Sequence, residues 1–373
     1  MIGEKKEMAI TNEAIMDVLK QVIHPEFKKS LVDLDLVREV EVAGNAVRVT
    51  VSVASKACSF KDKITDLVIN AIKSLDEGLN VEVVYSLMTS AERAKLLGKD
   101  PGEMDGIKQV RHIIAVASGK GGVGKTTVAV NLAIAMAKAG HKVGILDADM
   151  HGPDIPIMLG IKDRPLGSEG WLIPVEKYGI KVMSTGMLAG EGVPIVWRGP
   201  MVNKAIKEFT GHVKWGELDC LVVDLPPGTG DAAITLVKSI PLEGAVIVTT
   251  PQKVALSDVR RSIGLFLSEK VPILGIIENM SYLKVQAGDE EKIIHVFGSG
   301  AGEKMSEAFK IPLLGKVPLD SSIREGGDEG KPAALDPDNE GGKIFNDIAK
   351  VIFEALEKGG ECPLKKGLDK KGV

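Results

Sequence analysis

The sequence lacks features that several classes of protein need. Only three cysteines occur, Cys58, Cys220 and Cys362, and no two of them are close in sequence, so a disulfide framework and a CxxC motif are both absent. Aromatic residues make up 4% of the chain, too few for base-stacking platforms. Lysine and arginine (47) nearly balance aspartate and glutamate (51), which argues against a protein that coats nucleic acid.

Long apolar stretches are also missing. No run reaches the roughly 18 apolar residues that a membrane-spanning helix needs. The first residues, MIGEKKEMAITNEAIM, carry charges where a signal peptide is apolar. We therefore expect a cytoplasmic protein whose partners include neither membrane nor nucleic acid.

Apolar periodicity predicts two domains of unequal size. In residues 8–87, apolar residues at helical spacing precede an alternating strand at 47–53, a second helical stretch and a further strand, which predicts a small α+β domain. Residues 88–108 are polar, contain Gly and Pro, and are predicted to form a linker. In residues 109–358, β-branched apolar runs alternate with helical patterns, which predicts an α/β domain with a parallel sheet covered by helices on both faces. The remaining residues, 359–373, are expected to form a mobile tail.

A glycine-rich segment opens the second domain. Residues 119–126 read GKGGVGKT and fit the phosphate-binding pattern G-x-x-x-x-G-K-S/T between a predicted strand and a predicted helix. The glycines let successive N–H groups face phosphate oxygens, and the helix adds the positive end of its dipole. We expect Lys125 to reach the β- and γ-phosphates of ATP and the Thr126 hydroxyl to bind Mg²⁺. A chance glycine-rich turn is the alternative, which the flanking strand and helix disfavour. The expected ATP-binding residues of this segment are Gly119, Lys120, Gly121, Gly122, Val123, Gly124, Lys125, Thr126 and Thr127.

Acidic side chains follow two predicted core strands. Asp147 and Asp149 alternate where the run KVGILDAD ends, at the edge where open α/β sheets place their ligands. One can hold Mg²⁺ through water and the other can position an attacking water, although Asp-rich loop entries are common at strand ends. The run LVVDLP contains Asp224, a Walker B pattern whose carboxylate belongs in the outer shell of Mg²⁺. The following segment, Pro226 to Gly230, is a candidate switch loop that senses the γ-phosphate.

Asn279 follows another apolar run, ILGIIE. Its amide offers both a donor and an acceptor, which matches the edge of adenine. A polar cap at the end of a strand is the alternative.

The phosphate loop has a second lysine, Lys120, ahead of the usual one. In this respect the chain resembles the deviant Walker A ATPases, among them the nitrogenase iron protein, MinD and the partition ATPases. The resemblance implies a homodimer in which Lys120 crosses the interface and acts on the partner's nucleotide, as an arginine finger does. It also implies that Asp147 holds Mg²⁺ through water, that Asp149 positions the attacking water and that Asn279 reads the base. A solvated lysine is the alternative for Lys120.

Further stretches carry a closer resemblance: HPEFKKSLVDLDLVREVEV (24–42), SVASKACSFKDKI (52–64), GKGGVGKTT (119–127), DADMHGPDIPIMLG (147–160), IVWRGPMV (195–202), WGELDCLVVDLPPGTGDAAITL (215–236), ENMSYL (278–283), HVFGSGAG (295–302), LLGKVPLD (313–320) and GDEGKP (327–332). Over nearly all of residues 109–357 the chain resembles the Mrp-type iron–sulfur cluster carriers, and its first part resembles the small assembly-factor domain often fused in front of them. The resemblance implies slow, Mg²⁺-dependent ATP hydrolysis and iron–sulfur client or scaffold proteins as partners. It also implies a 4Fe–4S cluster bridging two subunits.

The chain departs from these carriers at the expected cluster site. They place a CxxC between the NMSY and FG segments, whereas this sequence reads LKVQAGDEEKIIHVFG (283–298) and has no cysteine there. Cys220 lies inside a predicted strand and is expected to be a buried small apolar residue. Cys58 is then the candidate cluster ligand or reactive thiol, with a structural role as the alternative. Around it the family pattern also changes, since Ser59 replaces a usual proline and His24 a usual aspartate.

Two functions without a cluster stay open: a nucleotide-gated dimerisation switch and a MinD-like positioning ATPase. A positioning ATPase would need a basic amphipathic C-terminal helix for the membrane. The helix predicted for residues 344–357 instead carries Asp347, Glu354 and Glu357 on its polar face. Electron transfer of the nitrogenase type is disfavoured because the ligand cysteines are missing.

Overall fold

The computed structural model divides the chain into two compact units, Met1–Met88 and Thr89–Val373. The structure describes residues 10–25, 27–53, 60–88, 92, 96, 105–150, 152–168, 170–188, 199–252, 255–287 and 290–358. Cys58, Cys362 and the predicted mobile tail lie outside the described residues.

The first unit is a small α+β domain with a three-stranded sheet, as predicted. Its elements are α1 (Asn12–Leu19), β1 (Val37–Ala43), β2 (Ala46–Val53), α2 (Lys61–Lys73) and β3 (Asn80–Leu87). β1 and β2 form an antiparallel hairpin, and α2 connects β2 to its parallel neighbour β3. Val47, Val49 and Val51 of β2 are buried, because alternate side chains of a strand lie on one face.

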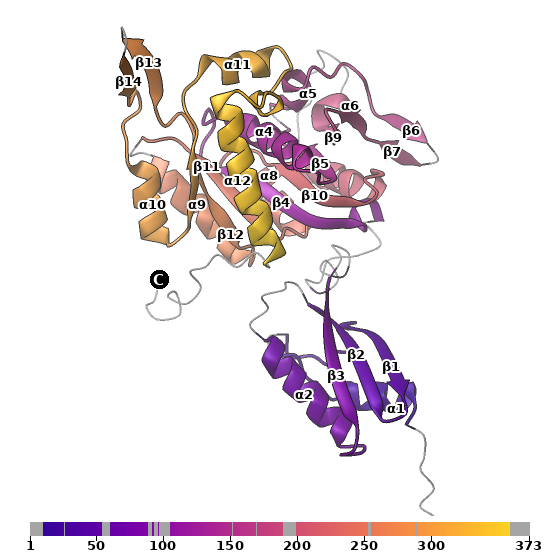
Figure 1. Cartoon of the computed structure of the whole chain (residues 1–373). Coiled ribbons are helices and arrows are strands. Elements are labelled where there is room, and N and C mark those ends of the chain that lie inside the picture. Colours follow the sequence, from indigo (N-terminus) through magenta and orange to yellow (C-terminus); the bar gives the residue numbers. More distant parts are fainter. Residues whose placement is uncertain are drawn as a thin grey trace, which may run out of the picture. The chain divides into compact units, whose positions relative to one another are not determined.

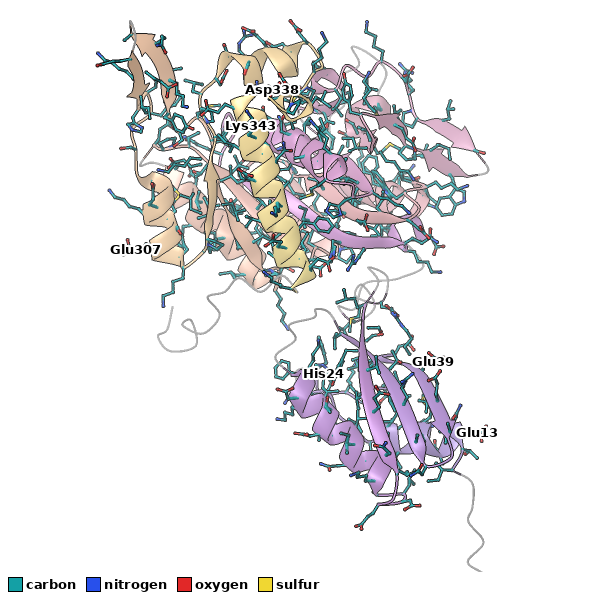
Figure 2. All side chains as sticks on the ribbon, viewed as in Figure 1. Glu13, His24, Glu39, Glu307, Asp338 and Lys343 are labelled. Atoms are coloured by element: carbon teal, nitrogen blue, oxygen red, sulfur yellow. The ribbon has the colours of Figure 1, made fainter. Side chains whose placement is uncertain are left out.

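His24 belongs to the packing of this first unit (Figure 2). It is 6% exposed, and its ring centroid lies 4.8 Å from that of Phe27 and 6.1 Å from that of Phe60. Its Nδ1 accepts a hydrogen bond from the Phe27 N–H at 3.3 Å. The imidazole therefore helps to fix the turn that follows it.

The second unit is built on an eight-stranded sheet in the order β15-β12-β11-β4-β10-β5-β9-β8. The bounds are β4 (Val110–Ser118), β5 (Val143–Asp147), β8 (Val175–Lys177), β9 (Ile180–Ser184), β10 (Leu218–Asp224), β11 (Gly244–Thr249), β12 (Ile273–Glu278) and β15 (Leu313–Lys316). The predicted parallel sheet is confirmed except at one edge, where β8 pairs antiparallel with β9. Tyr178 and Gly179 both have positive φ (51° and 77°), the backbone of a two-residue turn that brings the chain back beside itself.

Helices cover both faces of this sheet, as the sequence predicts (Figure 1). They are α4 (Lys125–Lys138), α5 (Ile155–Met158), α6 (Thr185–Leu188), α7 (Gly199–Lys207), α8 (Asp231–Ser239), α9 (Ala255–Ser268), α10 (Ala301–Phe309), α11 (Ser321–Asp328) and α12 (Glu340–Glu357). α4 and α12 share a core with Ile114 of β4, whereas α7, α8, α9 and α10 share a core with Ile113. Two successive residues of one strand thus supply opposite cores, which explains the nearly continuous apolar run of β4.

Two small hairpins complete the second unit (Figure 1). They are β6 (Leu166–Ser168) with β7 (Trp171–Ile173), and β13 (Leu283–Ala287) with β14 (Glu290–Ile294). The β13–β14 hairpin occupies the segment that lacks cysteine. Its Ile293 and Ile294 are 56% and 47% exposed, and Lys284 at its base binds Glu340 of α12 at 2.7 Å.

α12 is a core helix. Phe345, Ile348 and Ile352 are buried on one side, while Asp347 is exposed on the other. Of the helices that the structure describes, none combines the length and apolar content that crossing a membrane requires.

Candidate functional site

Three adjacent strands bring the phosphate loop and the acidic residues together at the carboxyl ends of the strands. β4 leads into the loop, β5 ends at Asp147, and β10, which lies between them, ends at Asp224. Asp224 is in register with Asp147 on one side and with Val116 on the other. The carboxyl ends of parallel strands thus place these groups together, although they come from distant parts of the sequence.

The phosphate loop runs from the end of β4 to Gly124, the residue before α4. Gly122 and Gly124 have φ of 74° and 78°, a left-handed conformation that glycine adopts without a steric penalty. A Cβ at Gly119 would lie 2.4 Å from the carbonyl carbon of Asp258, so the loop passes directly against α9. Val123 is 2% exposed and anchors the loop in the core. The first N–H groups of α4 follow this loop, and such a helix start favours an anion.

The Lys125 ammonium lies among buried carboxylates. Its Nζ is 2.7 Å from Asp224 Oδ1 and 3.5 Å from Asp149 Oδ2, and its side chain is 6% exposed. Thr126 Oγ1 donates to the other oxygen of Asp224 at 2.7 Å. Burial raises the pKa of Asp224, and the contacts with Lys125 and Thr126 oppose that rise. The carboxylates of Asp224 and Asp149 beside the ammonium are hard oxygen donors, the kind of ligand that Mg²⁺ prefers.

Asp147 is fully buried, and both of its oxygens hold backbone groups that follow β5. Oδ2 accepts from Ser184 Oγ at 2.9 Å and from Ile155 N at 3.3 Å, while Oδ1 accepts from Asp149 N at 3.3 Å. Burial raises the pKa of Asp147 well above its usual range, and the nearby Asp224 carboxylate adds to the rise. Beside its predicted Mg²⁺ role, Asp147 therefore fixes the position of Asp149.

Lys120 contacts a different strand end. Its Nζ donates to Gln252 Oε1 at 2.7 Å, and its carbonyl oxygen accepts from Ser118 Oγ at 2.9 Å. The predicted role of Lys120 lies in the site of a second subunit; within its own chain the ammonium is bound by the segment after β11. Thr127, at the start of α4, accepts a hydrogen bond at its carbonyl from Asn131 Nδ2 at 2.8 Å.

Asn279, directly after β12, holds the phosphate loop through a hydrogen bond to its backbone. Its Nδ2 donates to the carbonyl oxygen of Val123 at 2.8 Å, and the side chain is buried. A Cβ at Gly124 would lie 2.3 Å from this nitrogen, so the amide and the loop can touch only because Gly124 has no side chain. One amide N–H is thus used for the loop, and recognition of adenine stays a prediction for the remaining groups of the amide.

Thiolates are missing from the hairpin that stands at the expected cluster site, because its strands present Lys, Gln, Glu and apolar residues. Cys220 is fully buried on β10, as expected, and burial together with the Glu243 carboxylate raises the pKa of its thiol. A buried, protonated thiol is a poor metal ligand. Within the described part of the chain, no three His, Cys, Asp or Glu side chains are grouped so that they could hold a metal ion.

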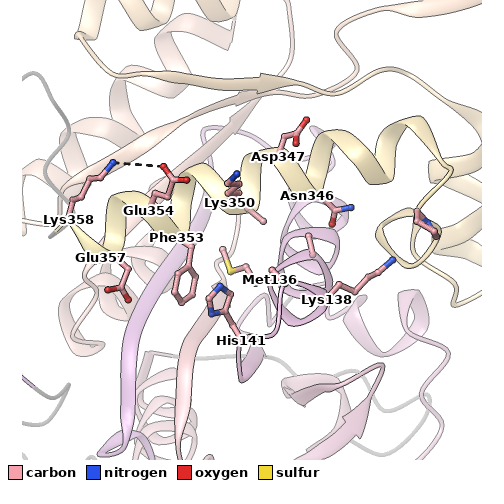
Figure 3. A pocket seen from close by; sticks show the side chains of 14 residues that line it. Met136, Lys138, His141, Asn346, Asp347, Lys350, Phe353, Glu354, Glu357 and Lys358 are labelled. Carbon is pink, nitrogen blue, oxygen red and sulfur yellow. Dashed lines mark ion pairs between the residues drawn. The ribbon is translucent and has the colours of Figure 1, made fainter.

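A hollow of about 760 Å³ lies elsewhere, between the C-terminal half of α4 and α12 (Figure 3). The rings of His141 and Phe353 stack beside it with centroids 3.6 Å apart. None of the residues expected to bind nucleotide lines this hollow. It lies at the opposite end of α4 from Lys125 and is separate from the phosphate loop.

Ser184, Gln252 and Glu278 take part in this edge of the sheet, although no sequence motif singled them out. Glu278 accepts from the Gly302 N–H at 2.6 Å, at the start of α10, and from Ser281 Oγ at 2.5 Å. Ser184 and Glu278 end their strands, and Gln252 follows the end of β11. A polar residue at the carboxyl end of each predicted parallel strand was the available signal.

Comparisons with known proteins bear on the whole chain. A family model described as NUBPL iron-transfer P-loop NTPase matches residues 109–353, and one described as iron–sulfur cluster assembly protein matches residues 12–84. An iron–sulfur cluster carrier protein of Synechocystis sp. is 44% identical over 92% of this chain and 97% of its own length. The nucleotide-binding protein of Archaeoglobus fulgidus in complex with ADP is 38% identical, with a TM-score of 0.56 over 67% of this chain and 96% of that one. The cell division ATPase MinD of Pyrococcus furiosus is 26% identical, with a TM-score of 0.50 over 66% of this chain and 99% of its own.

The position of Lys125 leads to a first prediction. Lys125→Ala should weaken binding of Mg-ATP by about 100-fold or more, since the loop then lacks its charged donor to phosphate. Calorimetric titration measures the affinity, and cooperative thermal unfolding shows that the variant keeps its fold. Lys138→Ala, on the same helix but far from the loop, is the matched control and should bind as the wild type does. Unchanged affinity in a folded Lys125→Ala variant would contradict the assignment.

Proposed function

The chain belongs to the family of NUBPL iron-transfer P-loop NTPases, and from that membership we propose that it binds Mg-ATP, hydrolyses it slowly as a homodimer, and carries or assembles iron–sulfur clusters for client proteins. The observation that carries the ATPase part is the Lys125 ammonium, 2.7 Å from the Asp224 carboxylate at the end of a glycine loop. The cluster part is supported by the names of the curated relatives and by the assembly-protein match of the small domain.

Phosphate binding follows from the loop and the start of α4. The N–H groups there face no acceptor within the helix, so phosphate oxygens can accept from them. Lys125 would give up its contact with Asp224 in favour of the β- and γ-phosphates. The loop shape is set by Gly122 and Gly124, and Asn279 holds it through the Val123 carbonyl.

The donor set fits Mg²⁺. Thr126 Oγ1 would ligate the ion directly, while Asp224 and Asp147 would hold its water ligands. Phosphate oxygens must supply the other contacts, in line with the absence of a complete protein cage among the described side chains. When bound, the ion neutralises charge on the phosphates that are being separated.

Hydrolysis requires a positioned water and a charge that stabilises the transition state. Asp149 is 8% exposed, its backbone N–H is held by Asp147, and its carboxylate would orient the water. Lys120 of a second subunit would donate to the developing charge on the phosphates, so that catalysis needs two chains.

An iron–sulfur cluster must be bound by residues other than the two cysteines of the family's CxxC motif, which this chain lacks. Soft thiolates hold iron–sulfur clusters, and Lys, Gln and Glu side chains of the β13–β14 hairpin are hard donors. We assign any cluster to Cys58, Cys362 or cysteines of a client protein. Cys58 and Cys362 from two subunits would make four thiolates, but they belong to different parts of the chain, which disfavours that set.

A nucleotide-gated dimerisation switch without a cluster is the second candidate. The hairpin favours it, because exposed Ile293 and Ile294 belong to the segment between NMSY and FG in which, by the resemblance, the carriers place their CxxC. A MinD-like positioning ATPase is disfavoured, because α12 buries its apolar side in the core and carries acidic residues on the other.

Action of Lys120 across the dimer gives a second prediction. Lys120→Ala and Asp149→Ala should each lower the rate of hydrolysis more than the affinity for ATP, since both residues act on the transition state. Mixing the two variants should restore about a quarter of the wild-type rate, because random pairing makes half of the dimers mixed and each mixed dimer has one intact site. Phosphate release measures the rate.

The double variant Lys120→Ala/Asp149→Ala is the matched control. Mixed with an equal amount of wild type, it forms mixed dimers with no intact site, so it should lower the rate of the wild-type chains to about half instead of restoring activity. A mixture of single variants that stays inactive, or hydrolysis that is first order in protein from a strict monomer, would contradict action across an interface.

The missing cysteines give a third prediction. After anaerobic reconstitution, the full chain should hold no stable bridging 4Fe–4S cluster at residues 283–298, and any bound iron should be lost when Cys58 and Cys362 are both replaced by Ser. Iron counting and visible absorbance decide the matter, with Cys220→Ser as the control that leaves bound iron unchanged. A full cluster per dimer that survives both Cys58→Ser and Cys362→Ser would show that other ligands exist, and would overturn this prediction.

A further inference from the structure

The side chain of Gln252 is built into a contact with Lys120. Gln252 Oε1 accepts from Lys120 Nζ at 2.7 Å and from Thr250 Oγ1 at 3.3 Å. Thr250 is 4% exposed and follows directly on β11, so the second donor is part of the core. Two donors on one oxygen fix the orientation of the amide, with its oxygen toward the lysine.

Lys120 is fixed at its backbone as well. Its carbonyl oxygen accepts from Ser118 Oγ, and the neighbouring Gly119 passes directly against the backbone of Asp258. Only the four-carbon stem of the lysine is then free to move, and its ammonium can reach either Gln252 or another acceptor. A contact with its own chain therefore competes with any contact to a second chain.

We propose that Gln252 is a positioning residue that holds Lys120 in its own subunit until the phosphates of a second, nucleotide-loaded copy take over the ammonium. This inference depends on the proposed action of Lys120 across a dimer. A neutral amide suits the task, because an ammonium is attracted more strongly to a charged phosphate, which adds the attraction of opposite charges, than to the oxygen of a neutral amide. Gln252 thus holds Lys120 while the subunit is alone, and the lysine moves to the phosphates of the second copy when these come within reach.

The test compares three side chains at position 252 in the full chain. With Mg²⁺ and a non-hydrolysable ATP analogue, Gln252→Leu should strengthen the dimer by roughly two- to tenfold, the effect of removing one competing hydrogen bond. Gln252→Glu should weaken the dimer by at least as much, because its carboxylate holds the ammonium more tightly. Sedimentation over a range of protein concentrations measures the dimer constant, and Gln21→Leu, on the surface of the first unit, is the control.

The same substitutions in the Lys120→Ala background separate positioning from a structural role. There, Gln252→Leu and Gln252→Glu should have no effect on the dimer constant, since the lysine that they act on is gone. A change of the same sign in both variants, or an effect that persists without Lys120, would overturn the inference while the dimer itself stands. A wild-type chain that stays monomeric with the analogue at every concentration would overturn both this inference and the proposed dimer.

Discussion

The buried Lys125 ammonium and the carboxylates around it are the constraint on which the rest of the second unit depends. The side chain of Lys125 is 6% exposed, and a charge buried to this extent is tolerated only when it is paired. Its partners come from other elements, Asp224 from the end of β10 and Asp149 from just after β5. The order and register of β4, β5 and β10 must therefore be right for the pair to form. The same arrangement that makes Lys125 stable also places it where phosphate oxygens can compete for it.

Many residues of the candidate site could be predicted from short contiguous sequence motifs. The loop from Gly119 to Thr126 is contiguous, and chemistry alone predicts a role for each of its glycines, its lysine and its threonine. Asp224 was predicted for a similar reason, because an apolar strand that ends in an acidic residue is visible in the sequence, and the structure places it 2.7 Å from Lys125. The alternation of Val47, Val49 and Val51 likewise predicted a half-buried strand.

Contacts between distant segments could not be read in this way. Lys120 and Gln252 are 132 positions apart, and Asn279 and Val123 are 156 positions apart. Both contacts depend on the strand order, in which β11 lies beside β4 and β12 beside β11, and linear patterns do not specify that order. The antiparallel strand β8 was missed because it depends on the backbone of two turn residues, Tyr178 and Gly179, the first of which is not a usual turn former.

One short segment, residues 279–282, joins the strand end that carries Asn279 to the β13–β14 hairpin, which has no cysteine. β12 ends at Glu278, Asn279 holds the loop, and β13 begins at Leu283. The exposed isoleucines of β14 therefore belong to a hairpin that begins four residues after Asn279, the residue that contacts the phosphate loop. This gives the chain a nucleotide site of the family's kind beside a surface that differs from it.

Coupling between the binding of Mg²⁺ and the binding of ATP is the most direct test of the proposed nucleotide site, since both ligands are assigned to the carboxylates around Lys125. The affinity for ATP is to be measured with and without Mg²⁺, in the wild type and in Asp224→Asn. We predict that Mg²⁺ strengthens binding by about tenfold or more in the wild type, and that this coupling becomes much weaker in Asp224→Asn. Equal affinity with and without Mg²⁺, or coupling that survives Asp224→Asn in full, would contradict it.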